Sequence, residues 1–393
     1  MDKLYVFYHK ADMDGLLSAM IVKRWLETSE RPSSYISLRT NMADAHFFFS
    51  NQVVYVPANY GDNFDDVINS MDEHDNCIML DFVLYNNGQN DNLDITAIAA
   101  KISNPVIVID HHVSQMAWLE TACKDLLARE KIIIAPYDKK RGACKAVWEF
   151  FFQADEFHKQ PLPLFIDIAS AADTWDRDYL YTYQLRHEVP NKLEQITWAK
   201  VQEWSFYWRY CQNMDFTDTT FSNEKLNELF GYIDTHNNDT SRLSLLECAV
   251  MKIIEEGEVA HQVLAGRNRT IWQAGFHTNI MVNGKTLRAY LVADYNNNGN
   301  VFEDVVGPVE SIVPEVDFVL LCKYDFRANK FRCTVFGNPK GDPNFSSDII
   351  AKSFGGGGHK GCAGFSCDDV HSMTLSDNET MITQITVSSG TGK

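Results

Sequence analysis

The stretch Phe7–Ala19, FYHKADMDGLLSA, joins an apolar run to a helix-like run through one histidine, two aspartates and a glycine. Upstream of the histidine, residues 4–9 are almost continuously apolar, which predicts a buried strand. Downstream, the apolar and small residues of 15–26 predict a helix. Polar groups therefore stand where a buried strand ends and a helix begins, which is where open α/β sheets bind their ligands.

The same alternation continues through the first 180 residues. Short apolar runs predict further strands at 53–58, 77–84, 105–112 and 131–137. Helix-like segments lie between them at 62–72, 91–102, 114–128 and 143–154. Continuous apolar strands separated by helices are typical of a parallel sheet covered on both faces. The predicted fold class is therefore α/β, with a doubly wound, mostly parallel N-terminal sheet.

The pattern changes after residue 160. Residues 160–265 are mostly helix-like, and 242–266 predict one long helix. Strand-like runs follow at 271–278, 287–293, 317–324 and 331–337, and then a short helix at 346–354 and a glycine-rich loop. We therefore predict four parts, which are an N-terminal domain (1–190), a helical connector (191–266), a smaller α/β domain (267–375) and a C-terminal tail (376–393).

Composition and charge narrow the class of protein. The 393 residues carry a net charge of −18, which repels long nucleic acids but suits a small anion held by bound cations. The nine cysteines are scattered without a Cys-x-x-Cys pair, which favours a reduced, cytoplasmic protein. No apolar run approaches the ~20 residues of a membrane span. We expect a cytoplasmic protein without membrane contact, and the sequence leaves a homodimer open.

Acidic and histidine residues gather at the predicted strand ends. They are His9, Asp12 and Asp14 after the first strand, Asp81 near the end of another, Asp110, His111 and His112 at the end of a third, and Asp173 after a helical run. Because the carboxyl ends of parallel strands meet at one edge of a sheet, we expect these side chains to converge on one crevice.

Such a cluster is costly among apolar residues unless another charge compensates it. Divalent cations do this, and mixed oxygen and nitrogen donors suit Mn²⁺, Fe²⁺, Co²⁺ or Zn²⁺ better than a pure oxygen set does. Six or seven ligands are too many for one tetrahedral ion and match two ions that share a carboxylate. We expect two divalent metal ions, with Mn²⁺ first and Mg²⁺, Co²⁺ or Fe²⁺ as alternatives.

Five short motifs stand in order along the chain. They are HKADMDG (9–15), MLDF (79–82), IDHH (109–112), AADTW (171–175) and FGGGGHKGCAGF (354–365). Together they resemble the motifs of the DHH phosphoesterase superfamily, in its DHH–DHHA1 branch. The resemblance implies a catalytic DHH domain in the N-terminal part and a substrate-binding DHHA1 domain in the C-terminal part.

The resemblance also implies roles for individual residues. It assigns His9, Asp12 and Asp81 to one metal ion, and Asp14, Asp81, His111 and Asp173 to the other, with Asp81 bridging. It gives Asp110 an orienting role and places His112 against the substrate phosphate. It implies that Gly356, Gly357, Gly358 and His359 bind the substrate's nucleotide or second phosphate.

The sequence alone does not decide the role of several further positions. Asp176 and Asp178 follow Asp173 within five residues, and either is an alternative ligand near the fourth motif. Arg141 precedes a helix start, where it either meets a phosphate or is a solvated loop charge. Phe336 stands where many relatives carry a substrate-binding arginine. Recognition of phosphate or base by the C-terminal domain is therefore expected to differ from that of the better-known members.

The function implied by the resemblance is two-metal hydrolysis of phosphodiester or phosphomonoester bonds through in-line attack by a metal-bridging hydroxide. The expected substrates are short and nucleotidic, namely nanoRNA, dinucleotides, 3′-phosphoadenosine-5′-phosphate or cyclic dinucleotides. A RecJ-like single-strand-specific exonuclease is the first alternative, and a non-catalytic nucleotide-sensing module is the second. The acidity of the chain favours small substrates over long strands.

Overall fold

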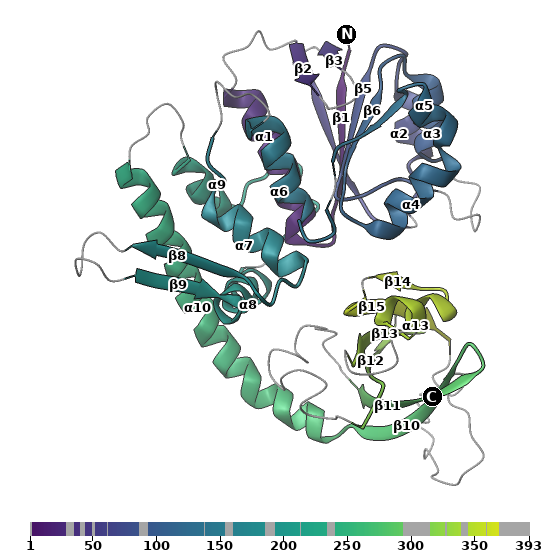
Figure 1. The fold of residues 1–393 in the computed structure, drawn as a ribbon, viewed down its shortest axis with the longest axis vertical. Helices are drawn as coiled ribbons and strands as arrows, with labels where there is room; N and C mark the ends of the chain where they lie inside the picture. The colour runs from purple at the N-terminus through teal and green to yellow at the C-terminus, as the bar shows by residue number, and fades with distance from the viewer. Residues whose placement is uncertain are drawn as a thin grey trace, which may run out of the picture. The chain divides into compact units, whose positions relative to one another are not determined.

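The computed structural model forms two compact units, Met1–His261 and Gln262–Lys393. Each is described here by itself (Figure 1). The structure describes residues 2–28, 35–39, 44–48, 52–60, 62–85, 93–136, 138–153, 160–184, 193–212, 214–233, 240–293, 315–326, 328–338, 345–358 and 360–368. Within these ranges, no helix combines the length and the hydropathy that crossing a bilayer requires.

A five-stranded parallel sheet forms the centre of the first unit. Its strands, in spatial order, are β4 (Val53–Ala58), β1 (Leu4–His9), β5 (Asn76–Leu80), β6 (Val106–Ile109) and β7 (Ile132–Ile134). All neighbouring pairs run parallel. Every residue of β1, β5 and β6 is buried, as strands covered on both faces must be. The predicted α/β class with a doubly wound parallel sheet is confirmed.

Alternate residues of β1 point into two separate apolar cores. Leu4, Val6 and Tyr8 contact one core, and Tyr5 and Phe7 contact the other. One core is closed by α1 (Met13–Thr28), α6 (Ala143–Trp148) and α7 (Leu164–Asp173). The other is closed by α2 (Asp65–Ser70), α3 (Ile95–Lys101), α4 (Val113–Ala122) and α5 (Lys124–Ala128), on the opposite face of the sheet in Figure 1.

The strand order reverses beside β1. The chain passes from β1 to β4 on one side, and all later strands of this sheet lie on the other side, beginning with β5. This reversal places a topological switch point between β1 and β5. In open α/β sheets the ligand binds outside the carboxyl ends of the strands at such a point. The structure therefore directs attention to the residues that follow β1 and β5.

The first unit contains further elements outside the five-stranded sheet and its covering helices. They are two hairpins, β2–β3 (Tyr35–Arg39, Asp44–Phe48) and β8–β9 (Leu180–Gln184, Leu193–Thr197), the π-helices η1 (Glu149–Gln153) and η2 (Tyr207–Cys211), and the helices α8 (Trp198–Phe206), α9 (Glu224–Gly231) and α10 (Thr240–Gln273). Trp204, Leu226 and Ile253 are buried in the same core as α1. Residues expected as a connector thus contribute to this core, and the boundary between the units falls within α10.

The second unit is a mixed six-stranded sheet with one helix. The strands, in spatial order, are β10 (Phe276–Val282), β11 (Lys285–Ala293), β12 (Phe318–Asp325), β13 (Lys330–Gly337), β15 (Cys362–Cys367) and β14 (Gly357–Gly358). Only β11 and β12 pair in parallel among these neighbours. Ile350 and Ala351 of α13 (Ser347–Ser353) pack on this sheet. The predicted smaller α/β domain is confirmed as a fold.

Two sequence predictions for the second unit are wrong in part. The run 271–278 was expected as a strand, but α10 continues to Gln273 and β10 begins at Phe276. The glycine-rich run was expected as a loop, but it contains β14 and leads into β15. A Cβ on Gly356 would lie 2.1 Å from the carbonyl oxygen of Gly364, so the absence of side chains allows this close pairing.

The two hairpins of the first unit are further differences. Neither β2–β3 nor β8–β9 was expected, because their segments show no continuous apolar run between helix-like patterns. Neither hairpin belongs to the five-stranded sheet, so they leave its strand order unchanged.

Candidate metal centre

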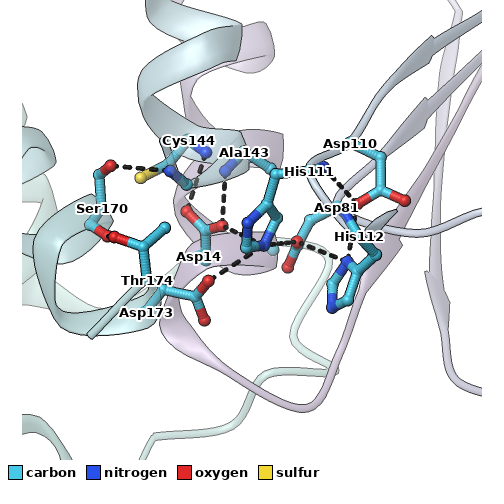
Figure 2. Close-up of polar contacts among 12 residues, drawn as sticks. Asp14, Asp81, Asp110, His111, His112, Ala143, Cys144, Ser170, Asp173 and Thr174 are labelled. Carbon is cyan, nitrogen blue, oxygen red and sulfur yellow. Dashed lines mark hydrogen bonds and ion pairs between the residues drawn. The ribbon is translucent and has the colours of Figure 1, made fainter. Parts of the chain in front are cut away.

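The predicted ligands converge at the carboxyl ends of the parallel strands (Figure 2). His9 ends β1, Asp14 is the second residue of α1, and Asp173 ends α7. Asp81 directly follows β5, and Asp110, His111 and His112 fill the gap between β6 and α4. Asp12 lies in the turn between β1 and α1. Side chains from four separate segments thus meet at the switch point of the sheet.

Asp81 turns the chain away from the sheet. The strand predicted over 77–84 ends at Leu80, because Asp81 takes a left-handed backbone conformation with φ of 55°. Its N–H still donates to the carbonyl oxygen of Ile109 at 2.9 Å, which holds the turn against β6. Such a conformation costs roughly 1–3 kcal/mol in a residue other than glycine, and aspartate is among those that tolerate it best.

The first donor group consists of His9, Asp12 and Asp81. The Nδ1 atom of His9 lies 2.9 Å from Asp12 Oδ2 and 3.6 Å from Asp81 Oδ2. One donor atom from each residue lies within 4.8 Å of the others, a spacing that can hold a metal ion.

The second donor group consists of Asp14, His111 and Asp173. The Nε2 atom of His111 lies 3.0 Å from Asp173 Oδ2 and 3.8 Å from Asp14 Oδ2. It also lies 3.4 Å from Asp81 Oδ1. The two oxygens of Asp81 therefore face different groups, Oδ2 toward His9 and Oδ1 toward His111. This is the placement that a bridging carboxylate requires.

Backbone amides at the start of α6 hold Asp14 in place. The N–H of Ala143 donates to Oδ2 at 2.7 Å, and the N–H of Cys144 donates to Oδ1 at 2.8 Å. The preceding N–H, of Gly142, donates to Ser170 Oγ at 2.8 Å. Asp14 is only 2% exposed, and these buried donors compensate part of the cost of its charge.

Two glycines make room for this arrangement. A Cβ on Gly15 would lie 2.1 Å from the carbonyl oxygen of His9, so only glycine allows the helix to start this close to the strand. A Cβ on Gly142 would lie 3.1 and 3.2 Å from the two carboxylate oxygens of Asp14. The glycine in the first motif is therefore explained by contact between the backbone segments that carry the ligands.

Asp110 orients the two histidines that follow it. Its Oδ1 accepts hydrogen bonds from the N–H of His111 at 2.7 Å and the N–H of His112 at 3.2 Å. The same oxygen lies 2.7 Å from Nδ1 of the His112 ring. This contact fixes the ring through Nδ1, and the His112 side chain is 18% exposed.

Pairing between histidines and aspartates overcomes the effect of burial on the histidine pKa values. Burial lowers the pKa of His9, but hydrogen bonds and attraction to the carboxylates of Asp12 and Asp81 raise it to about 11. Burial likewise lowers the pKa of His112, and the Asp110 carboxylate raises it to about 9. Burial raises the pKa of Asp14 well above its usual range, and repulsion from Asp81 and Asp173 adds to this.

The chemistry of the donor set fits divalent cations. Asp81 is 1% exposed, and among the described residues neither of its carboxylate oxygens has a hydrogen-bond partner of good geometry, since His9 Nδ1 and His111 Nε2 lie 3.6 and 3.4 Å away. A buried carboxylate without such partners is costly, and a cation shared between both oxygens would compensate it. Carboxylate and imidazole donors together suit Mn²⁺, Fe²⁺, Co²⁺ or Zn²⁺.

The other residues predicted for the site differ in where they lie relative to the donor groups. Asp173, and not Asp176, lies within reach of His111; Asp176 is exposed. Arg141 pairs with Glu149 and donates to the carbonyl oxygen of Pro136. Of the positions predicted to bind substrate in the second unit, Gly356, Gly357 and Gly358 are described, whereas His359 lies outside the described residues. Phe336 is fully buried in β13.

Three residues near the cluster were not found from the sequence. Ser170 accepts the N–H of Gly142, Tyr60 lies beside His9, and Gln115 joins Tyr60 to the turn after Asp81. The carboxyl end of β4 was a signal for Tyr60, since the strand next to a switch point lines the same crevice. No sequence signal marks Ser170 or Gln115, whose partners are distant along the chain.

Comparison with known proteins agrees with this geometry. Residues 3–172 match the model of the DHH family, N-terminal domain. This segment contains the whole parallel sheet and all clustered side chains except Asp173, which follows it by one residue. No curated protein matches the chain significantly.

Solved structures show distant likeness over the whole chain. The chain is 12% identical to a pGpG-specific phosphodiesterase, PggH, from Vibrio cholerae, with a TM-score of 0.36 over 93% of each chain. It is 8% identical to CDC45 from Entamoeba histolytica, with a TM-score of 0.40 over 93% of this chain and 92% of that one. These values are too low to transfer an activity. The family match identifies residues 3–172 as a DHH-family N-terminal domain.

Proposed function

We propose that this chain is a metal-dependent phosphoesterase that hydrolyses phosphodiester or phosphomonoester bonds in short nucleotidic substrates. The observation that carries this proposal is the position of Asp81 between two donor groups, with one carboxylate oxygen facing each. Paired divalent ions that share a carboxylate are typical of phosphoryl-transfer sites. Metal ions, with Mn²⁺ the first candidate, would polarise the phosphoryl group and activate water when bound.

His9, Asp12 and Asp81 would hold one ion, and Asp14, Asp81, His111 and Asp173 the other. Between them, the crevice at the ends of β1 and β5 would receive the phosphate. The backbone amides of Ala143 and Cys144 keep Asp14 oriented while its charge is drawn toward a cation. This preorganisation lowers the cost of rearranging the site during reaction.

His112 supports the proposal with a positioned proton donor. Asp110 holds Nδ1 of His112 and raises the pKa of this ring to about 9 in the absence of metal, so this carboxylate favours the imidazolium. Nε2 can then donate a hydrogen bond to a phosphoryl oxygen that gains charge in the transition state. The partial exposure of this side chain leaves it accessible to a substrate.

The glycine-rich run of the second unit is proposed to bind the substrate's nucleotide or second phosphate. Gly356 and Gly358 lie too close to β15 for a side chain, since their Cβ positions would be 2.1 Å from Gly364 O and 2.6 Å from Ala363 Cα. Gly357 is exposed, and nothing lies within 4 Å of its Cβ position. The same holds for Gly355, so the backbone at Gly355 and Gly357 is open to a ligand.

Two other functions compete with this one. A RecJ-like exonuclease would degrade long single strands, and a nucleotide-sensing module would bind without turnover. The net charge of −18 weighs against the first, because it repels long polyanions. The complete donor set weighs against the second.

The test is product release from a defined panel in Mn²⁺ and in chelator. The panel holds a dinucleotide, a five-nucleotide RNA, a long single-stranded DNA, a cyclic dinucleotide, 3′-phosphoadenosine-5′-phosphate and pyrophosphate. Asp81→Asn is the inactivating variant, because asparagine tolerates the left-handed backbone at this position. Asp176→Asn is the matched control, since that carboxylate lies outside the donor groups.

We expect Mn²⁺-dependent cleavage of a short substrate that Asp81→Asn abolishes and Asp176→Asn retains. Sustained degradation of the long strand would support the exonuclease instead. Absence of turnover across the panel, despite bound metal, would support the sensing module.

A further inference from the structure

Tyr60 presents an exposed aromatic ring beside the first donor group. It lies two residues beyond the end of β4, the strand that neighbours β1. Its ring centroid is 5.5 Å from that of His9, and 46% of the residue is exposed. Single exposed aromatic side chains are common on protein surfaces and indicate nothing by themselves. An exposed aromatic side chain beside a candidate metal site is different, because its exposed surface can contact a bound ligand.

A buried amide holds this ring in position. Gln115 is 3% exposed, and its Nε2 donates a hydrogen bond to the Tyr60 hydroxyl. At its other end, Oε1 of Gln115 accepts the N–H of Val83 at 2.7 Å. The ring also packs against Phe82, with centroids 5.4 Å apart. Tyr60 is thus tied to the turn that carries Asp81, although 46% of the residue remains exposed.

The backbone around Tyr60 is held to the end of β1. The N–H of Lys10 donates to the carbonyl oxygen of Ala58 at 2.9 Å, and Lys10 Nζ pairs with Asp62 Oδ2 at 2.5 Å. The same Asp62 oxygen accepts the N–H of Asn59 at 3.0 Å, and Asn59 Oδ1 accepts the N–H of Tyr60 at 2.8 Å. Lys10 directly follows His9, so these contacts hold the backbone of Tyr60 at a fixed distance from His9.

Two more aromatic rings continue from Tyr60. The centroid of Tyr85 lies 6.2 Å from that of Tyr60, and the centroid of Trp118 lies 5.5 Å from that of Tyr85. Both of these side chains are partly exposed. Their planes are inclined to one another, at 66° for Tyr60 and Tyr85 and 49° for Tyr85 and Trp118, so these rings support Tyr60 as neighbours. Exposed aromatic side chains are the groups on which proteins stack nucleobases.

We propose that Tyr60 is a base-stacking residue whose ring takes the nucleobase adjacent to the phosphate held at the metal centre. The inference rests on the proposed function for the place of the phosphate, and it adds a reason for selecting nucleotides over other phosphate esters. Stacking on a positioned ring adds affinity that does not depend on charge, which matters in a chain of net charge −18.

The test compares two probes that differ only in the base, AMP and ribose 5-phosphate, by titration in the presence of Mn²⁺. The full chain is measured beside Tyr60→Leu, which removes the ring, and Tyr60→Phe, which removes only the hydroxyl. Phe326→Leu is the matched control, because Phe326 is 78% exposed and lies in the other unit. Folding of each variant is checked by its thermal unfolding transition.

We expect the full chain to bind AMP on the order of 10- to 100-fold more tightly than ribose 5-phosphate. Tyr60→Leu should reduce this preference to within about threefold, whereas Tyr60→Phe and Phe326→Leu should keep it. Equal binding of the two probes by the full chain, or equal weakening of both by Tyr60→Leu, would overturn the inference.

Failure of this inference and failure of the proposed function are separable. The function is judged by Mn²⁺-dependent turnover of a dinucleotide by the full chain, which requires no preference for AMP. The stacking role is judged by equilibrium binding, which requires no turnover.

Discussion

At the residue scale, Asp110 determines the protonation state of His112. Its carboxylate lies 2.7 Å from Nδ1 and raises the pKa of this ring to about 9 against the opposing effect of burial. The same oxygen accepts two backbone N–H groups, so Asp110 orients the ring and keeps it charged. Asparagine has the same shape as aspartate without the charge, so Asp110→Asn separates the effect on ring orientation from the effect on ring charge.

We predict that Asp110→Asn lowers kcat at pH 8 by about 10- to 100-fold with metal content unchanged. His112 is protonated below its pKa, and loss of the carboxylate charge lowers that pKa from about 9 toward the usual value near 6.5. The alkaline limb of the kcat profile should therefore move to lower pH. Profiles from pH 6 to 10, with metal content measured in parallel, check this, and an unmoved limb would show that the charge on His112 is not used.

Metal binding should release protons from the cluster. In the metal-free chain, Asp12 and Asp81 raise the pKa of His9 to about 11, so this ring is protonated at neutral pH. A metal ligand must be neutral imidazole, so Mn²⁺ has to displace that proton, and affinity should rise with pH between about 7 and 9. Calorimetry of Mn²⁺ binding in buffers of different ionisation enthalpy gives the number of protons released. His9→Gln should release about one proton fewer than the original chain. Affinity independent of pH would contradict this.

The residues that form the cluster were predictable one by one from the sequence, but the residues that hold them in place were not. Asp81 stood out because a carboxylate amid apolar strand residues needs compensation. Asp173 and Asp176 could not be separated, because the end of α7 was not predicted: the helix ends at Asp173, and Trp175, with φ of 54°, turns the chain before Asp176. Tyr60, Gln115 and Ser170 were missed because their partners are determined by the fold and not by nearby sequence.

At the element scale, α10 depends on close contact with α8. Gly257 lies in α10, and a Cβ at this position would lie 1.9 Å from the carbonyl oxygen of Glu203 and 2.7 Å from its carbonyl carbon. Backbone atoms cannot rotate away as a side chain can. Gly257 therefore sets the distance between the two helices, although glycine in a helix interior costs about 1 kcal/mol relative to alanine.

We predict that Gly257→Ala lowers the free energy of unfolding by about 1–3 kcal/mol, because the overpacking outweighs the gain in helix propensity. Gly231→Ala is the control, since nothing lies within 4 Å of its Cβ position at the end of α9. That substitution should be neutral or stabilising by up to about 1 kcal/mol. Urea denaturation of both variants distinguishes the two, and a Gly257→Ala chain as stable as the original would contradict the close contact.

The elements that could be predicted are the strands that are covered on both faces of the sheet. The strand Leu4–His9 was predicted to the residue, because parallel strands read as continuous apolar runs. The strand after Asn76 was predicted four residues too long, since Phe82 and Val83 stay buried beyond the turn at Asp81. Strand β14 could not be predicted, because glycine has low strand propensity and its role here is close backbone approach.

At the scale of the whole molecule, the charge balance discriminates between short and long substrates. The chain has 53 acidic against 35 basic residues and a net charge of −18. A protein that follows a long polyanion releases counterions and loses affinity steeply as salt rises. A net acidic protein instead repels an anionic substrate at long range, and salt screens that repulsion.

We predict that kcat/KM for a dinucleotide stays level or rises as KCl increases from about 50 to 200 mM, because screening weakens the repulsion. Proteins with extensive phosphate contacts lose on the order of 10³–10⁵ in affinity over this range. Initial rates measured at subsaturating dinucleotide across this range of KCl give kcat/KM directly. A steep fall with salt would indicate many phosphate contacts and favour the exonuclease.

The central claim is that Asp81 bridges two metal ions, and Mn²⁺ stoichiometry tests it most directly. The chain, Asp81→Asn and the control Asp176→Asn would each be titrated with Mn²⁺ at pH 8, with bound metal measured after equilibrium dialysis. We predict two ions per chain for the original and for Asp176→Asn, and loss of tight binding at both positions in Asp81→Asn, because one Asp81 oxygen faces His9 of the first donor group and the other faces His111 of the second. One ion per original chain, or two ions retained by Asp81→Asn, would contradict the account.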